Sequence, residues 1–126
     1  MGAVEDYLSA MTDRDWGRVA ASLSDHGLVR NGPFVDVIEG RDAYVEFLRR
    51  VCSPFDSYRL DVHRVSRSGD RLVFAEIDEV IGRDGTVSSF PEVLVFELDD
   101  GGAIRAVSVF MKRPGGQPSI EGGRAS

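Results

Sequence analysis

The sequence predicts an α+β fold in which helices come first along the chain and a run of antiparallel strands follows. Up to Val51, apolar residues recur at the spacing of amphipathic helices. From Tyr58 onward, apolar and polar residues alternate with the period of two that is typical of strands. Asp84-Gly85, a favoured two-residue hairpin turn, separates two of these alternating stretches. We therefore expect the helices to pack against one face of the sheet.

Each expected helix has an apolar face. The helix at residues 3–12 has the stripe Val4, Tyr7, Leu8 and Met11. Asp15 is a suitable N-cap for a second helix, whose apolar face comprises Trp16, Val19, Ala20 and Leu23. A third helix opens at Gly40-Arg41-Asp42 and buries Tyr44, Val45, Leu48 and Val51. Between the last two helices we expect a short extended piece at 28–30, a turn or bend at Asn31-Gly32-Pro33 and a loop over the core at 34–38.

The expected strands are residues 58–65, the two arms of the central hairpin and residues 104–112. On the last strand the alternation places four residues on the face of Glu92, Leu94 and Phe96, namely Ile104, Ala106, Ser108 and Phe110. We expect one domain over residues 1–113. Residues 114–126 are rich in Gly, Pro and Ser and are expected to form a flexible C-terminal tail.

The hairpin has one face that is mainly apolar yet carries two carboxylates. With Asp84-Gly85 at the turn, Glu92 lies opposite Ile77, and Glu79 shares their face. The two glutamates are then diagonal neighbours, roughly 5.5–8 Å apart between Cβ atoms. In an apolar cavity, desolvation and mutual repulsion would raise at least one pKa, which is how a general acid and a general base can arise side by side. The alternative is that one glutamate is hydrated or paired to an arginine at a pocket mouth or dimer interface, and Pro91 could mark a bulge that turns Glu92 outward.

Composition excludes several classes of function. The net charge is -6 and there is no basic stripe, so nucleic acid is not an expected partner. One cysteine, Cys52, and two histidines are too few for a zinc or thiolate site, so we expect neither metal nor cofactor. No apolar run of about 18 residues and no secretory signal is visible, which makes a cytoplasmic protein without membrane contact the expectation.

The chain resembles the NTF2-like superfamily, which includes ketosteroid isomerases, limonene-epoxide hydrolases and SnoaL-type polyketide cyclases. The residues that carry the resemblance run in order from about residue 3 to residue 113: Tyr7-Leu8-Ser9-Ala10-Met11, Asp15-Trp16, Val29-Arg30-Asn31-Gly32-Pro33, Gly40-Arg41-Asp42-Ala43, Gly69-Asp70-Arg71-Leu72-Val73 and Val95-Phe96-Glu97-Leu98-Asp99-Asp100-Gly101. The resemblance implies a cystatin-like cone: a curved antiparallel sheet around a pocket that three N-terminal helices close.

The family's catalytic residues are only partly present. Compared with ketosteroid isomerases, Tyr7 falls at the tyrosine position, but Asn31 replaces the catalytic base and Leu94 the second aspartate. Compared with limonene-epoxide hydrolases, Asn31 matches the asparagine and Glu79 stands at one aspartate position. There Val29 replaces a tyrosine, Ile77 an arginine and Ser108 an aspartate. An amide cannot shuttle a proton, so any chemistry must differ from that of these relatives.

We therefore expect a pocket protein for an apolar terpenoid-, polyketide- or steroid-like molecule, acting as a cyclase, isomerase or hydrolase. The alternative is a non-catalytic ligand-binding or dimerisation module. Glu79, Glu92, Asn31 and Tyr7 are the candidate catalytic residues, although Asn31 could serve only its turn and Tyr7 only the core. Candidate substrate-binding residues are Leu8, Met11, Trp16, Phe47, Ile77, Phe90, Leu94, Ser108 and Phe110. A homodimer through the open sheet face is also expected, because that face would expose Phe74, Val93, Val95, Val107 and Val109.

Overall fold

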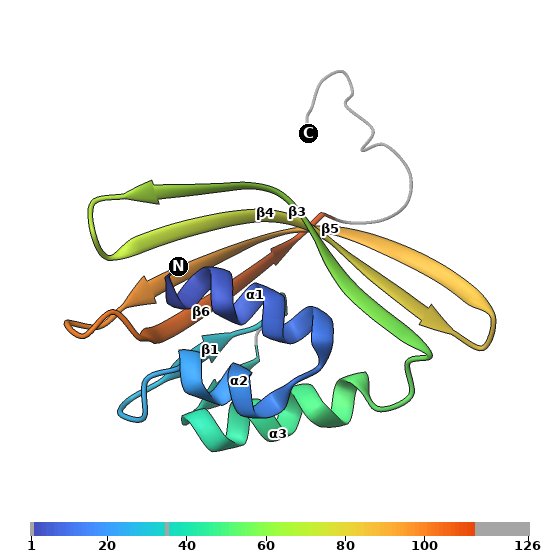
Figure 1. Cartoon of the computed structure of the whole chain (residues 1–126), viewed down its shortest axis with the longest axis horizontal. Coiled ribbons are helices and arrows are strands. Elements are labelled where there is room, and N and C mark those ends of the chain that lie inside the picture. Colours follow the sequence, from blue (N-terminus) through green and yellow to red (C-terminus); the bar gives the residue numbers. More distant parts are fainter. Residues whose placement is uncertain (1, 35, 113–126) are drawn as a thin grey trace.

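The computed structural model describes residues 2–34 and 36–112, so the expected tail at 114–126 lies outside the described residues. Three helices lie together on one side of a six-stranded sheet (Figure 1): α1 (Ala3–Asp13), α2 (Trp16–Ser22) and α3 (Arg41–Cys52). The α+β class and the helix positions predicted from the sequence are confirmed. Asp15 caps α2 as predicted, because its Oδ1 accepts a hydrogen bond from the Arg18 backbone N–H at 3.2 Å.

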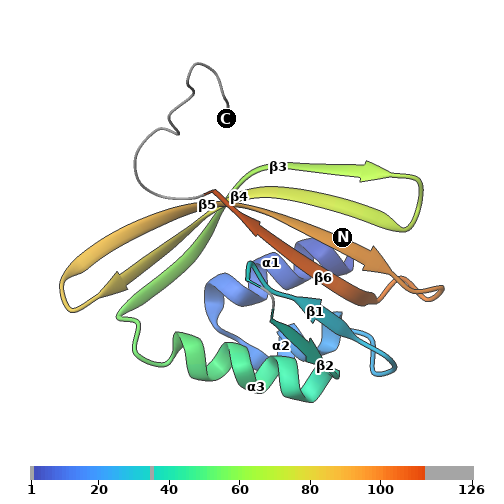
Figure 2. The same cartoon turned by 180° about the vertical axis from the view of Figure 1, so that it is seen from behind.

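The sheet has the strand order β2-β1-β6-β5-β4-β3. Its strands are β1 (Val29–Asn31), β2 (Val37–Glu39), β3 (Ser57–Ser68), β4 (Leu72–Arg83), β5 (Thr86–Leu98) and β6 (Ile104–Met111). The pair β1–β6 is parallel and the other neighbouring pairs are antiparallel. Figure 2 shows the short strands β1 and β2 continuing the sheet past β6, beside the helices. The expected loop over 34–38 is thus wrong at its C-terminal end, where residues 37 and 38 belong to β2. A strand of three residues is too short for an alternating pattern to be recognised.

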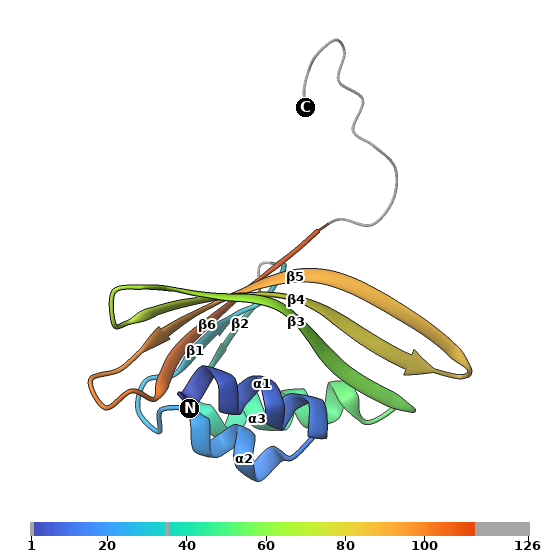
Figure 3. The same cartoon turned by 45° about the horizontal axis from the view of Figure 1, so that its top comes forward.

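The long strands bend strongly, so that the sheet arches over the helical layer (Figure 3). The central hairpin has the predicted register, with Ile77 opposite Glu92 and Arg83 opposite Thr86. Asp84 and Gly85 have φ angles of 52° and 80°, the left-handed backbone that a two-residue hairpin turn requires. The concave face of β4 buries Val73, Ala75 and Ile77 against the helices.

The face predicted for β6 is wrong beyond its first residue. Leu98 pairs with Ile104, whereas Glu97 pairs with Ala106, so Arg105 is an extra residue in a β-bulge. A one-residue slip moves every later side chain to the opposite face. Val107, Val109 and Met111 therefore lie opposite Phe96, Leu94 and Glu92, while Ala106, Ser108 and Phe110 point to the convex side. Consequently Val107 and Val109 are not part of the exposed sheet face.

No helix among the described residues is both long and apolar enough to cross a membrane.

Candidate functional site

A cavity of about 160 Å³ lies between the concave face of the sheet and the helices. It has an apolar body and a small set of polar groups, which is the usual composition of a small-molecule site. The lining residues are Tyr7, Met11, Arg30, Pro33, Tyr44, Phe47, Leu48, Val51, Cys52, Tyr58, Leu60, Ile77, Glu79, Glu92, Leu94, Val109 and Met111.

Glu79 and Glu92 enter this cavity from β4 and β5. Glu92 is buried, with only 8% of its surface exposed. Burial raises the pKa of Glu92 to about 9, and the hydrogen bond and negative charge of Glu79 act in the same direction, while the Arg30 charge opposes them. Oε2 of Glu79 accepts a hydrogen bond from the Tyr58 hydroxyl at 2.6 Å. Near neutral pH Glu92 therefore holds its proton, while Glu79 accepts the Tyr58 hydrogen bond.

Pro91 does not turn Glu92 outward. The register of β4 against β5 runs without a shift through Asp78 opposite Pro91 and Ile77 opposite Glu92. The Pro91 carbonyl accepts a hydrogen bond from the Lys112 N–H at 3.1 Å, on the side of β6. Within a strand the N and the carbonyl of one residue point to the same side, so the missing N–H of Pro91 faces the end of β6. No hydrogen bond to β4 is lost there.

Two tyrosines form a second polar group in the cavity. The hydroxyl oxygens of Tyr7 on α1 and Tyr44 on α3 are 2.5 Å apart. Burial is the main reason that the pKa of each tyrosine lies above its usual value, so both are neutral hydroxyl groups near pH 7. The Tyr7 ring also meets Phe96 edge to face at 5.5 Å. Tyr7 is thereby fixed by the core on one side and by Tyr44 on the other.

Arg30 is the third polar group. Its guanidinium lies over the Phe47 ring at 4.8 Å and over the Tyr44 ring at 5.9 Å. Nη1 donates to Oδ2 of Asp36 at 2.9 Å, which ties β1 to the loop that leads into β2. Arg30 reaches the cavity because it lies opposite Val107, one of the concave-face residues of β6.

A model of the SnoaL-like domain matches residues 4–107 of the chain. The chain belongs to the SnoaL-like family. The predicted resemblance to the NTF2-like superfamily is thus confirmed, and the solved structures below share this fold.

A SnoaL-like fold is also seen in the solved structures that the chain resembles. An LEH-like epoxide hydrolase from M. tuberculosis is 27% identical with a TM-score of 0.76, over 87% of this chain and 80% of that one. A candidate polyketide cyclase from Xanthomonas campestris pv. campestris is 22% identical with a TM-score of 0.76, over 86% of each chain. A candidate ketosteroid isomerase from Kribbella flavida is 22% identical with a TM-score of 0.73, over 92% of this chain and 79% of that one. No curated protein sequence matches the chain.

The cavity between the sheet and the helices brings together part of the predicted site. Of the candidate catalytic residues Tyr7, Glu79 and Glu92 line it, and so do the candidate binding residues Met11, Phe47, Ile77 and Leu94. Leu8 is a core residue beside a separate shallow hollow between α1 and β3, and Trp16 packs half-buried at the edge of the core. Phe90 is half-buried opposite Glu79, outside the residues that line the cavity.

Asn31, Ser108 and Phe110 lie on the convex side, in contrast to their predicted place in the pocket. Asn31 is exposed, and its Nδ2 lies 3.5 Å from Oγ of Ser108. Phe110 is 59% exposed. The cause is the bulge at Arg105 together with the register of β1, which turns Arg30 rather than Asn31 toward the cavity.

Sequence reasoning missed Arg30, Tyr44 and Tyr58 as site residues. A signal existed for Arg30, because Leu28 and Arg30 are both buried and follow the strand period of two. Tyr58 lies opposite Ile81, and Tyr44 belongs to the apolar stripe of α3 that was read as core. That these groups meet around the glutamates depends on the curvature of the sheet, which the sequence pattern does not show.

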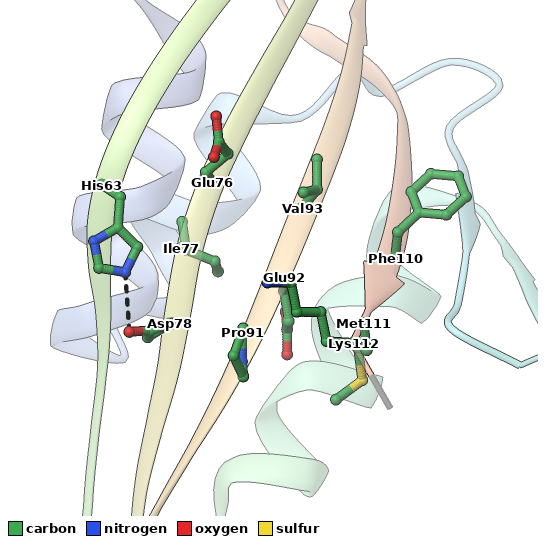
Figure 4. Close-up of a pocket in the computed structure, with 10 residues that line it drawn as sticks. All are labelled: His63, Glu76, Ile77, Asp78, Pro91, Glu92, Val93, Phe110, Met111 and Lys112. Carbon is green, nitrogen blue, oxygen red and sulfur yellow. Dashed lines mark ion pairs between the residues drawn. The ribbon is translucent and has the colours of Figure 1, made fainter. Parts of the chain in front are cut away.

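The convex side carries a second hollow of about 430 Å³, behind Glu92 (Figure 4). His63, in a bulge of β3, faces Asp78 on β4, with Nε2 2.9 Å from Oδ2. Phe110 and Val93 form its apolar wall. Among residues 2–34 and 36–112, no group of three or more His, Cys, Asp or Glu side chains is placed to hold a metal ion.

Proposed function

We propose that the protein is a cofactor-independent enzyme that performs acid–base chemistry on a small, mainly apolar molecule. The observation that carries the proposal is the carboxyl pair in the cavity: Glu92 with its pKa raised to about 9, next to Glu79, which accepts the Tyr58 hydrogen bond. A carboxyl that keeps its proton near neutral pH, set beside a second carboxyl in one site, provides a proton donor next to a candidate acceptor.

In the proposed reaction, Glu79 takes a proton from the substrate and Glu92 gives its proton to a second position. The two glutamates end with their protonation states exchanged. Because Glu79 is close enough to raise the pKa of Glu92, a proton shift from Glu79 to Glu92 can restore the starting state. A net relocation of a proton of this kind suits an isomerisation or a cyclisation, and a hydrolysis would add water as co-reactant.

The size of the cavity limits the substrate. A volume of about 160 Å³ corresponds to roughly five water molecules and lies below the range of about 300–1,000 Å³ that is usual for drug-sized ligands. Such a cavity suits a small terpenoid or a short polyketide-derived molecule better than a whole steroid nucleus. The likeness to an LEH-like epoxide hydrolase at 27% identity supports including hydrolases among the reaction classes tested.

The proposal is tested with Glu79→Gln and Glu92→Gln in assays on small cyclic ketones, terpenoid epoxides and polyketide-derived esters. Loss of a general acid or base lowers turnover by about 10²–10⁴-fold, so each variant should lose at least 10²-fold. Glu97→Gln is the control, because Glu97 lies on the convex face and pairs there with Arg105 at 2.9 Å. Wild-type turnover should also decline above about pH 9, where Glu92 loses its proton. Turnover that survives both variants would show that the carboxyl pair does not carry the reaction.

A further inference from the structure

Arg30 contains a buried donor without an acceptor. The side chain is 9% exposed, and its Nε has no hydrogen-bond partner among the described residues. A buried donor that has lost water and gained no acceptor is costly, and this is more so for a charged group. The unpaired donor belongs to a residue that lines the cavity. An acceptor supplied by a ligand would remove this cost.

The guanidinium is also held in one orientation before any ligand binds. Nη1 is fixed by Asp36, and the guanidinium carbon lies 4.8 Å from the centre of the Phe47 ring. The Asp36 carboxylate is itself placed by the Phe34 backbone N–H, which donates to Oδ1 at 3.2 Å. A donor fixed in advance loses little freedom when it binds an acceptor, which is the basis of preorganised binding.

Arg30 is the one cationic residue among those that line the cavity. The carboxyl pair lines the cavity from β4 and β5 of the same sheet, and the Arg30 charge is close enough to oppose the rise in the pKa of Glu92. A ligand in the cavity can therefore contact a fixed cation and an acid–base pair together, with the apolar side chains of Leu48, Ile77 and Leu94 around its body.

We propose that Arg30 binds the ligand through an uncharged acceptor oxygen, a carbonyl or an epoxide oxygen, with the guanidinium as the donor. The inference rests on the proposed function in that it uses the same cavity, but it concerns binding and substrate class rather than turnover. An uncharged oxygen fits better than a carboxylate, because Arg30 already pairs with Asp36 and Glu79 faces the same cavity. A ligand carboxylate would be a second anion on this guanidinium, in a cavity that already contains two glutamates.

The wild-type protein provides the first test. Binding of cyclohexanone, cyclohexene oxide, cyclohexene and cyclohexanecarboxylate, which share a six-membered ring, is measured by NMR titration. Cyclohexanone and cyclohexene oxide should each bind more tightly than cyclohexene. Whichever of the two binds more tightly shows whether Arg30 prefers a carbonyl or an epoxide oxygen. The carbonyl ¹³C resonance of bound cyclohexanone should move downfield, as expected for a hydrogen bond from a cation. Preferred binding of the carboxylate, or an unshifted resonance together with equal binding of cyclohexene, would overturn the proposal.

Arg30→Met is the second test, since methionine keeps much of the side-chain length and removes every donor. A hydrogen bond to a charged group corresponds to about tenfold or more in affinity, so the ketone and the epoxide should lose at least this factor relative to cyclohexene. The matched control is Arg50→Met on the exposed side of α3, where the side chain is 69% exposed. An unchanged ratio of ketone to cyclohexene affinity in a folded Arg30→Met protein would overturn the proposal. If that variant does not fold, the wild-type ¹³C shift still decides.

The two proposals fail in different ways. Glu79→Gln should keep the ¹³C shift of bound cyclohexanone, because it leaves Arg30 in place, while it abolishes turnover. A lost shift in Arg30→Met with turnover that survives the glutamate variants would refute the acid–base function and keep the binding role of Arg30. A retained shift in Arg30→Met with turnover lost in the glutamate variants would refute the role of Arg30 alone.

Discussion

The Tyr58 hydroxyl donates to Oε2 of Glu79 across 2.6 Å, in the same cavity as the buried carboxyl of Glu92. Tyr58 comes from β3, at the edge of the sheet, and its ring stacks on Phe55 with centroids 6.0 Å apart. Among the described residues no hydroxyl donates to Glu92, and burial raises its pKa to about 9. The surroundings of the two glutamates thus differ because of a third residue from a neighbouring strand.

Tyr58→Phe should destabilise the protein near neutral pH. The substitution removes the donor to Glu79 and keeps the stacked ring, so the change isolates one hydrogen bond to a carboxylate. Such a bond contributes about 1.5–3 kcal/mol, and the free energy of unfolding in urea should fall by an amount of this order. Tyr44→Phe, which removes a bond between two neutral hydroxyls, should cost only about 0.5–1.5 kcal/mol. A Tyr58→Phe protein as stable as the wild type would mean that the bond does not support Glu79.

The pH dependence of stability should carry the signature of Glu92. Its pKa is about 9 in the folded protein against the ordinary value of 4.5, so between these values the folded state binds more protons than the unfolded state. Stability from this group is therefore complete below about pH 4.5, declines as the pH rises, and levels off above about pH 9. Glu92→Gln mimics the protonated form and should flatten this decline. Urea denaturation from pH 5 to pH 9 measures the decline in the free energy of unfolding. Parallel plots of this free energy against pH for the wild type and Glu92→Gln would contradict the raised pKa of Glu92.

The hairpin and its two inward glutamates could be predicted because the signals are local. Asp84-Gly85 fixes the turn, and a register that starts from a two-residue turn carries through to Ile77 and Glu92. The helices were likewise evident from their own apolar stripes and from the cap at Asp15. Each of these features depends on residues that are close together in the sequence.

The rest of the site depends on contacts between distant segments. A single extra residue at Arg105 reverses the faces of Ser108 and Phe110, and a bulge changes no residue type in the alternating pattern. Arg30 contacts the rings of Tyr44 and Phe47 only because the parallel β1–β6 pair sets its direction. Two parallel strands are not joined by a short turn that could be recognised in the sequence. Arg30 was therefore not predicted as a polar group of the cavity.

We propose a homodimer through the convex face of the sheet, which carries Phe74, Val93 and Val95 together with the 59% exposed Phe110. Exposed apolar area of this kind favours association with a second surface. Phe110→Glu should shift the protein toward monomer in sedimentation velocity at micromolar concentration, because a dimer would bury the new charge. Val62→Glu is the control, since Val62 lies opposite Ile77, off the convex face, and is 45% exposed. A wild-type monomer at micromolar concentration would exclude this dimer.

Cys52 should report on occupation of the cavity. Its thiol is buried at the end of α3 and lines the cavity, and burial, with a smaller effect from the Glu79 charge, raises its pKa to about 11. Because the thiolate is the reactive form, alkylation by iodoacetamide at pH 8 should be far slower in the folded protein than in urea. A ligand in the cavity should slow the reaction further by covering the sulfur. Mass spectrometry of the modified fraction measures both rates. Alkylation that is equally fast in the folded and unfolded states would mean that Cys52 is open to solvent, and rates unaffected by a bound ketone would place the ligand outside this cavity.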